Sequence, residues 1–259
     1  MDHSGGMLSW LFERRSRAGA KPLPRVPDGS RVYAIGDIHG RADLLAGLHE
    51  RIRADAAGAP ARKVVIYLGD YVDRGLQSCA VVDTLLDAPL PGFEAVHLRG
   101  NHEAALLEFL TDARIGPSWM QYGGSATLLS YRVGLANGEG GGTDYQSAQK
   151  EFAARLPARH RAFYEGLAVS REEGDYFFVH AGVRPGVPLD RQAVEDMLWI
   201  RDEFLDFTGT FGRIVVHGHT ITDAPEVRDN RIGIDTGAFA TGQLTCLVLE
   251  GSERRFLST

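Results

Sequence analysis

The chain has 259 residues, of which 31 are glycine, and 44% of its residues are hydrophobic. That apolar share excludes extensive disorder, and the glycines follow no three-residue repeat, which excludes a collagen-like chain. The formal net charge of −6 argues against a broad nucleic-acid-binding face. No run approaches the roughly 18 apolar residues that a membrane-spanning helix needs. We therefore expect neither a nucleic-acid partner nor stable membrane association.

Residues 1–30 are rich in Gly, Pro and Arg and predict a flexible N-terminal leader. Residues 31–259 are expected to form a single catalytic domain. The leader's apolar stretch precedes its arginines, which is the reverse of the order in a secretory signal. Cys79 and Cys246 lie far apart in the chain, and we expect two reduced thiols and a cytoplasmic location.

The first half of the domain alternates short apolar runs with segments of helical periodicity. Strands are predicted at 31–35, 64–68 and 94–98, and helices at 42–54, 75–86 and 101–110. This order predicts right-handed crossovers between largely parallel strands. Helical spacing returns near 151–166, and the remainder predicts short strands with one helix near 191–199.

Residues 113–148 interrupt this alternation. They contain the pair Gly123-Gly124 and a glycine cluster within 138–142, with little periodicity between them. We expect a mobile insertion or lid here rather than an element of the core, with the cluster forming a flexible rim near substrate.

Five short motifs carry the chemistry, and most of them follow a predicted strand. They are GDIHG at 36–40, GDYVDRG at 69–75, RGNHE at 99–103, HAG at 180–182 and HGHT at 217–220. Because ligands of open α/β sheets bind beyond the carboxyl ends of the strands, we expect these turns to converge.

The residue types in these motifs suit a pair of metal ions. Asp, Asn and His together offer oxygen and nitrogen ligands for first-row transition metals. A carboxylate between two metals about 3.5–4 Å apart binds both, and such a pair activates a water for attack on a phosphoryl group. Asp70, with a glycine on its N-terminal side, is the best candidate for this bridge. Each motif alone also has a plain structural explanation, such as a turn, a core histidine or a surface ion pair.

The series of motifs resembles that of the calcineurin-like metallophosphoesterases. It is most similar to the phosphoprotein phosphatase (PPP-type) family of Ser/Thr phosphatases in a short bacterial form, over about residues 31–249. The resemblance implies an α/β fold of two central mixed β-sheets flanked by helices, with the metal site at the strand C-terminal ends. It also implies two divalent transition-metal ions, with Mn as the first choice over Fe, Zn and Ni.

The resemblance assigns a role to each matching residue. His102 would be the general acid, oriented by Asp73, while Arg74 would hold phosphate oxygens. Arg201 is expected to be the second phosphate arginine, with Arg184 as the alternative. The implied metal ligands are Asp37, His39, Asp70, Asn101, His180 and His219.

Other residues near the motifs are expected to be structural. Glu103 is expected to stabilise its turn, and His217 to be no ligand. The histidines at 49, 97 and 160 are expected to pack, because they have no partner motif.

The implied function is a Ser/Thr protein phosphatase that hydrolyses a phosphoprotein or phosphopeptide by direct attack of metal-bound hydroxide, without a phosphoenzyme. One alternative is a symmetrical diadenosine tetraphosphatase-like dinucleoside polyphosphate hydrolase. Such enzymes commonly lack the Asp of the Asp-Arg-Gly triplet, so residues 73–75 favour the phosphatase. A non-catalytic scaffold on the same fold is disfavoured, because every expected position is filled. The physiological substrate, a preference for tyrosine or nucleotide substrates and the oligomeric state stay open.

Overall fold

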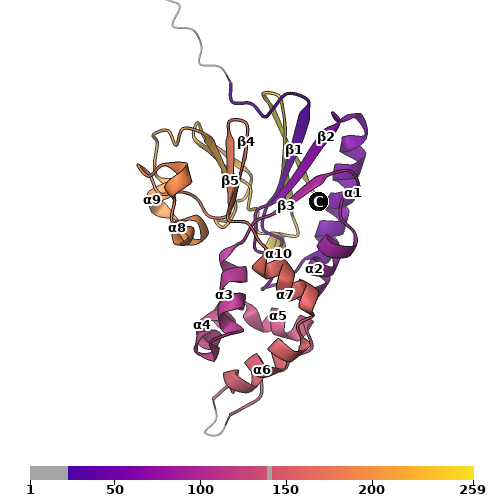
Figure 1. The fold of residues 1–259 in the computed structure, drawn as a ribbon, viewed down its shortest axis with the longest axis vertical. Helices are drawn as coiled ribbons and strands as arrows, with labels where there is room; N and C mark the ends of the chain where they lie inside the picture. The colour runs from indigo at the N-terminus through magenta and orange to yellow at the C-terminus, as the bar shows by residue number, and fades with distance from the viewer. Residues whose placement is uncertain (1–22, 139–141) are drawn as a thin grey trace, which may run out of the picture.

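The structure is a computed structural model that describes residues 23–138 and 142–259, and it contains two five-stranded sheets (Figure 1). Sheet 1 has the order β10-β9-β1-β2-β3, and sheet 2 has the order β4-β5-β6-β8-β7. The strands of sheet 1 are β1 (Ser30–Ile35), β2 (Arg62–Tyr67), β3 (Glu94–His97), β9 (Thr245–Glu250) and β10 (Glu253–Ser258). Those of sheet 2 are β4 (Ser170–Glu173), β5 (Tyr176–Val179), β6 (Ile214–His217), β7 (Glu226–Val227) and β8 (Arg231–Gly233).

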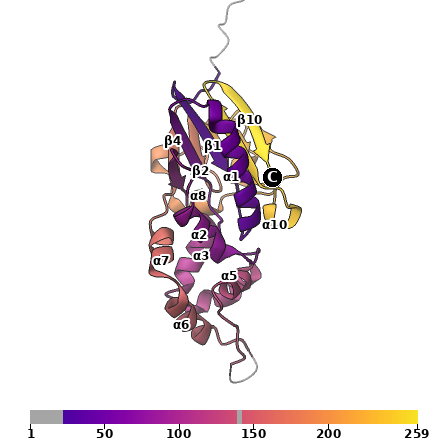
Figure 2. The ribbon, with the colours of Figure 1, turned by 90° about the vertical axis from the view of Figure 1, so that its right-hand side faces the viewer.

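Helices surround both sheets. In chain order they are α1 (Ala42–Asp55), α2 (Ser78–Asp87), α3 (Asn101–Phe109), α4 (Gly116–Gln121), α5 (Gly124–Ser130), α6 (Tyr145–Arg155), α7 (Ala158–Glu165), α8 (Val194–Trp199), α9 (Asp202–Leu205) and α10 (Ala238–Thr241). Figure 2 shows α1 lying along sheet 1, and Figure 1 shows α8 and α9 beside sheet 2.

Both sheets are mixed. In sheet 1, β1 pairs in parallel with β2 and antiparallel with β9, while β2 and β3 are parallel. In sheet 2, β5, β6 and β8 are parallel and the edge strands β4 and β7 are antiparallel. The predicted fold of two mixed sheets flanked by helices is confirmed.

The run 64–68 is apolar throughout because sheet 1 is covered on both faces. Val64 and Ile66 belong to a core between the two sheets, together with Phe178 and Val216 of sheet 2. Val65 belongs to the core on the opposite face of sheet 1. A strand buried on both faces needs apolar side chains at consecutive positions.

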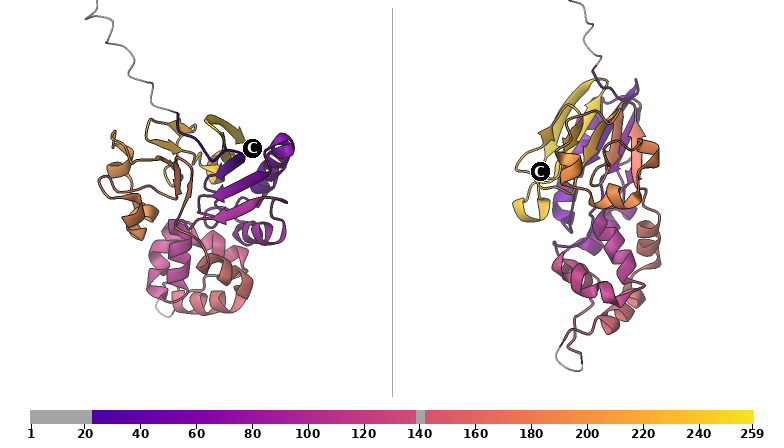
Figure 3. Two further views of the ribbon diagram at one scale, coloured as in Figure 1. Left: turned by 45° about the horizontal axis from the view of Figure 1, so that its top comes forward. Right: turned by 90° about the vertical axis from the view of Figure 1, so that its left-hand side faces the viewer.

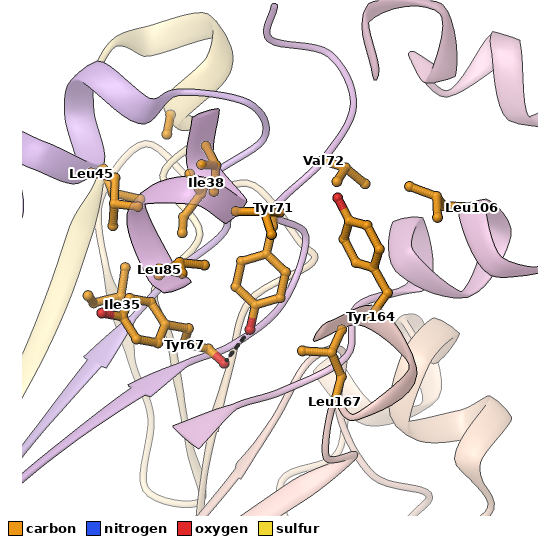
Figure 4. Close-up of a cluster of buried hydrophobic side chains, with 14 of the residues drawn as sticks. Ile35, Ile38, Leu45, Tyr67, Tyr71, Val72, Leu85, Leu106, Tyr164 and Leu167 are labelled. Atoms are coloured by element: carbon orange, nitrogen blue, oxygen red, sulfur yellow. Dashed lines mark hydrogen bonds between the residues drawn. The ribbon is translucent and has the colours of Figure 1, made fainter. Parts of the chain in front are cut away.

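Helices α3 to α7 gather at one end of the two sheets, where β3 leads directly into α3 (Figure 3). They share a core with sheet 1, in which Tyr71, Leu106 and Tyr164 lie together (Figure 4). This end of the molecule also carries the C-terminal ends of β1, β2 and β3, where the first three motifs begin.

The expectation that residues 113–148 contribute no core element is wrong for their first half. This stretch forms α4 and α5, and Trp119 and Leu128 are fully buried in the core shared with sheet 1. Helices of six and seven residues span too few turns for their periodicity to show in sequence. The proposed flexible rim falls largely on residues 139–141, outside the described residues.

Two boundaries also differ from the expectation. The helical stretch 151–166 is two helices, because Leu156 is extended before Pro157 and ends α6. Of the predicted leader, residues 1–22 lie outside the described residues. Val26 is fully buried, and its N–H donates to the Gly251 carbonyl at 3.0 Å, so packing begins before the expected position 31.

Neither cysteine is in a disulfide, in agreement with the prediction of two thiols. Among the described residues, no helix has both the length and the apolar character that crossing a bilayer requires.

Candidate metal and phosphate site

The turns after β1, β2 and β3 touch one another through their backbones. The N–H groups of Ile38 and His39 both donate to the Asp70 carbonyl, at 3.1 and 2.8 Å. A Cβ on Gly69 would lie 2.5 Å from the backbone nitrogen of Gly100, so only glycine permits this approach. The predicted convergence of these motifs is therefore present in the fold.

Backbone strain is concentrated in the same turns. Six described residues other than glycine have positive φ, and five of them belong to the motifs. Such conformations cost about 1–3 kcal/mol each and collect at functional sites. The five are His39, Asp70, Asp73, Arg74 and His219.

Asp70 lies at the centre of the converged side chains. His39 Nε2 is 3.4 Å from Asp70 Oδ2, and His180 Nε2 is 3.5 Å from Asp70 Oδ1. Two groups of candidate ligands have their atoms within 4.8 Å of one another, and Asp70 belongs to both. One group adds His39 and His102 to Asp70, and the other adds His180 and His219.

The remaining predicted ligands line the same space. Asn101 Oδ1 lies 2.9 Å from His180 Nε2. Asp37 Oδ2 accepts the backbone N–H of His219 at 3.0 Å. The structure thus brings all six predicted ligands into one region. The group around His39 contains His102, which was not predicted as a ligand, in place of Asp37, which was.

The chemistry of these residues fits bound metal ions. Asp37 Oδ1 and His219 Nε2 are buried without a hydrogen-bond partner. His39 Nδ1 donates to the Val72 carbonyl at 2.8 Å and His180 Nδ1 to the Leu68 carbonyl at 3.0 Å. In this tautomer, each Nε2 lone pair faces the carboxylates, which is the usual arrangement of histidine ligands.

The pKa values agree with this fit. Burial lowers the pKa of His39 to about 3, and burial with the neighbouring His180 lowers that of His219 to about 2, so both imidazoles are neutral. Burial with Asp235 and Asp70 raises the pKa of Asp37. Neutral imidazoles and crowded carboxylates are groups that a divalent cation stabilises.

His102 and Asp73 form a buried pair beside the candidate ligands. His102 Nδ1 donates to Asp73 Oδ2 at 2.6 Å, and both side chains are buried. Burial alone would lower the pKa of His102, but Asp70 and Asp73 raise it to about 9. The two carboxylates thus favour the protonated imidazole, and with Nδ1 engaged by Asp73 the proton left to donate is the one on Nε2.

Two arginines flank the candidate metal ligands. Arg74 Nη2 lies 3.4 Å from His102 Nε2, and its guanidinium stacks on the Phe239 ring at 4.7 Å. Arg201 Nη1 lies 3.3 Å from Thr220 Oγ1, next to His219. Arg184, the alternative to Arg201, instead forms ion pairs with acidic residues, namely Asp196 and Glu203. The geometry favours Arg201 over Arg184.

Glu103 holds the site together, as predicted. Its two carboxylate oxygens accept four backbone N–H groups from the second and third motifs at 2.8–3.3 Å. These belong to Asp70, Tyr71, Val72 and Gly100.

The remaining histidines pack, as predicted. His97 stacks on Tyr67 with ring centroids 4.9 Å apart, and His49 Nε2 accepts the Tyr67 hydroxyl at 2.8 Å. His160 is fully buried against the Tyr131 hydroxyl. His217 lies 3.3 Å from a guanidinium nitrogen of Arg231 and belongs to neither group of candidate ligands.

Sequence reasoning missed three buried residues of this site. Trp119 and Thr127 donate to the Asp73 carboxylate, and Asp235 is buried beside Asp37. The only local signal for the first two was the pair Gly123-Gly124 between them, and Asp235 belongs to none of the five motifs.

A cluster of candidate carboxylate, amide and imidazole ligands beside a histidine–aspartate pair and two arginines is the set of groups that metal-dependent hydrolysis of a phosphate ester uses. The comparisons with known proteins specify the class further. The profile described as calcineurin-like phosphoesterase matches residues 30–234, and the chain belongs to this family.

Two curated relatives match most of the chain. The asymmetrical bis(5'-nucleosyl)-tetraphosphatase PrpE of Anoxybacillus flavithermus is 25% identical, covering 82% of this chain and 88% of the relative. Serine/threonine-protein phosphatase 2 of Escherichia coli strain K12 is 26% identical, covering 83% of this chain and 90% of the relative. Relatives with two different substrates are thus similar to this chain at nearly equal identity.

The fold has solved counterparts. A structure assigned provisionally as a diadenosine tetraphosphatase superposes with a TM-score of 0.61 at 20% identity, covering 92% of this chain and 98% of that one. A Saccharomyces cerevisiae protein serine/threonine phosphatase gives a TM-score of 0.53 at 14% identity, covering 89% and 79%. These likenesses establish the fold.

Proposed function

We propose that this protein is a dinuclear-metal phosphomonoesterase that removes phosphate from phosphoserine or phosphothreonine in proteins. The observation that carries the proposal is the hydrogen bond of 2.6 Å between His102 Nδ1 and Asp73 Oδ2. It lies beside the Asp70 carboxylate, which belongs to both groups of candidate ligands. An alkoxide is a poor leaving group, so its departure benefits from a proton donor at this position.

The proposed ligands are Asp37, His39, Asp70, Asn101, His180 and His219. When bound there, two divalent transition-metal ions, Mn among them, supply charge for two phosphoryl oxygens and a lowered pKa for a water molecule.

The chain's own residues perform the remaining steps. The guanidinium groups of Arg74 and Arg201 bind phosphoryl oxygens and orient the phosphorus for in-line attack. The oxygen of a water molecule forms a bond to phosphorus, and the bond from phosphorus to the seryl or threonyl oxygen breaks. His102 gives its Nε2 proton to the departing oxygen while Asp73 holds Nδ1, and the proton of the attacking water passes to solvent.

The charge beside Arg201 supports a peptide over a polyphosphate. A surface groove that includes Trp199 and Arg201 is also lined by Asp196 and Glu203, which both pair with Arg184, and by two further carboxylates, those of Glu195 and Asp202. These carboxylates repel an extended polyphosphate chain and attract basic residues of a peptide near the phosphorylated side chain.

A dinucleoside polyphosphate hydrolase is the second candidate. It is favoured by the similarity to the bis(5'-nucleosyl)-tetraphosphatase, a relative as similar to this chain as the protein phosphatase. The exposed rings of Tyr122 and Trp199, near His102 and His219, offer surfaces on which a base would stack.

Rates on matched substrates test the proposal. The purified protein with added Mn is assayed with phosphoserine and phosphothreonine peptides, with basic or acidic residues beside the phosphate, and with diadenosine tetraphosphate. We expect orthophosphate release from the peptides at a higher kcat/KM, with the basic peptides preferred. Cleavage of the dinucleotide without orthophosphate release from any peptide overturns the proposal, and the products, ADP alone or ATP with AMP, identify the cleavage as symmetrical or asymmetrical.

A further inference from the structure

The Asp73 carboxylate is held by two residues of the helical segment that sequence alone suggested to be a lid. The indole Nε1–H of Trp119 donates to Asp73 Oδ2 at 2.8 Å, and the Thr127 hydroxyl donates to Oδ1 at 2.6 Å. Trp119 lies on α4 and Thr127 on α5. The oxygen bound by Trp119 is the one that accepts Nδ1–H of His102.

These contacts fix the carboxylate in position and orientation. Asp73, Thr127 and Trp119 are at most 1% exposed, so no solvent replaces a lost donor. Thr127 Oγ1 also accepts the Asp73 backbone N–H at 2.8 Å, so this one hydroxyl holds both the backbone and the carboxylate of Asp73. Asp73 has a φ of +70°, a conformation that needs such support in a residue with a side chain.

The rest of the segment keeps Trp119 and Thr127 in place. The Trp119 ring lies 4.8 Å from that of Phe109 and 6.0 Å from that of Phe152. A Cβ on Gly124 would lie 2.6 Å from the Trp119 indole, and one on Gly123 would lie 2.7 Å from the backbone nitrogen of Arg74. The glycine pair therefore lets the α4–α5 junction pack against both the indole and the Asp-Arg-Gly turn.

We propose that Trp119 and Thr127 are positioning residues for His102 that act through Asp73. Neither side chain reaches the substrate. Together they hold the Asp73 carboxylate in the orientation that directs the proton on His102 Nε2 toward the departing oxygen. This inference rests on the proposed phosphomonoesterase activity, because it assigns the helical segment a task in the proton transfer of that reaction.

The test compares leaving groups in variants of the full-length protein. Thr127→Val keeps the side-chain shape and removes the hydroxyl, and Thr127→Ser keeps the hydroxyl. Ser78→Ala is the matched control. The buried Ser78 hydroxyl lies 3.1 Å from that of Thr127 and, like it, accepts the Asp73 backbone N–H, at 3.2 Å, but it makes no hydrogen bond to the Asp73 carboxylate. Each protein is assayed for kcat and KM on a phosphoserine peptide and on p-nitrophenyl phosphate, whose leaving group needs little protonation.

We expect Thr127→Val to lower kcat on the phosphopeptide by roughly ten- to a hundredfold, with little change in KM or in p-nitrophenyl phosphate hydrolysis. Thr127→Ser should restore the phosphopeptide rate, and Ser78→Ala should affect both substrates equally. Trp119→Phe, which keeps a ring between Phe109 and Phe152, should show the same selective loss as Thr127→Val. The ¹H NMR signal of the His102 Nδ1 proton should shift or broaden in Thr127→Val relative to Thr127→Ser.

Equal losses on both substrates in Thr127→Val and Trp119→Phe, or no loss on either, overturn the inference. A wild-type protein that hydrolyses no phosphomonoester with added metal overturns the proposed function itself. The two failures are distinct, because the first requires an active wild-type enzyme.

Discussion

The Asp70 carboxylate occupies the place where a side chain on Gly100 would begin. A Cβ on Gly100 would lie 2.0 Å from Asp70 Oδ1 and 2.5 Å from the Asp70 backbone nitrogen. Oδ1 is also the oxygen that faces His180 at 3.5 Å. Because Gly100 has no side chain, it leaves room for the Asp70 carboxylate, which belongs to both groups of candidate ligands.

Gly100→Ala is expected to displace this carboxylate. The loss of ligand geometry should weaken metal binding by about ten- to a hundredfold and lower phosphatase activity with it. Gly47→Ala is the control, because a Cβ there meets nothing within 4 Å and the residue lies inside α1. It should leave activity unchanged and raise the free energy of unfolding by about 0.5–1 kcal/mol. Calorimetry measures the metal affinity of both variants, and urea unfolding measures their free energies of unfolding. Metal binding by Gly100→Ala as tight as in the wild type contradicts this account.

His102→Ala should lower kcat on a phosphoserine peptide by roughly 10²–10⁴-fold, because in the proposed mechanism His102 supplies the proton that the departing oxygen takes up. On p-nitrophenyl phosphate the loss should be much smaller. Steady-state kinetics with both substrates measure the ratio. Comparable rates of phosphopeptide hydrolysis in the variant and the wild type would remove His102 from the role of acid.

Arg201 and Arg184 provide a matched pair for phosphate binding. Arg201→Ala should raise the KM for phosphosubstrates and the inhibition constant of inorganic phosphate by about ten- to a hundredfold, because a charge-assisted hydrogen bond is lost. Arg184→Ala should change neither, since Arg184 is occupied by Asp196 and Glu203. If the two variants exchange these phenotypes, the assignment of the second arginine is wrong.

His49 should make stability depend on pH. Burial lowers the pKa of His49 to about 4, so between this value and about 6.5 the unfolded chain binds a proton that the folded protein does not. The free energy of unfolding should therefore fall as the pH falls from about 6.5 to 4, by at most about 3 kcal/mol from this residue. Urea unfolding at several pH values in that range should show that the free energy of unfolding depends less steeply on pH in His49→Gln than in the wild type. The glutamine keeps an acceptor for the Tyr67 hydroxyl. Equal slopes in the two proteins would contradict the prediction.

Local sequence features were enough to predict the strands β1 to β3, the helices between them and the convergence of the motifs, while the family resemblance singled out the individual residues around Asp70. Each of those residues follows a strand or begins a helix, so its place follows from the nearest element. The strand order of sheet 2 was not predictable, because it depends on pairings between segments far apart in the chain. The hydrogen bonds of Trp119 and Thr127 to Asp73 join residues 46 and 54 positions apart in the chain. The helices that carry these two residues are too short to be predicted from hydrophobic periodicity.

The measurement that tests the central claim most directly is a metal titration of the metal-free protein, followed by orthophosphate release from a phosphoserine peptide. Activity should be absent without metal and should reach its maximum at two equivalents of Mn per chain. Asp70→Asn should bind metal poorly and stay inactive, while Asp87→Asn, a change at an exposed carboxylate, should match the wild type. Full activity in the metal-free protein, or at a single equivalent, would contradict the account of a dinuclear phosphomonoesterase.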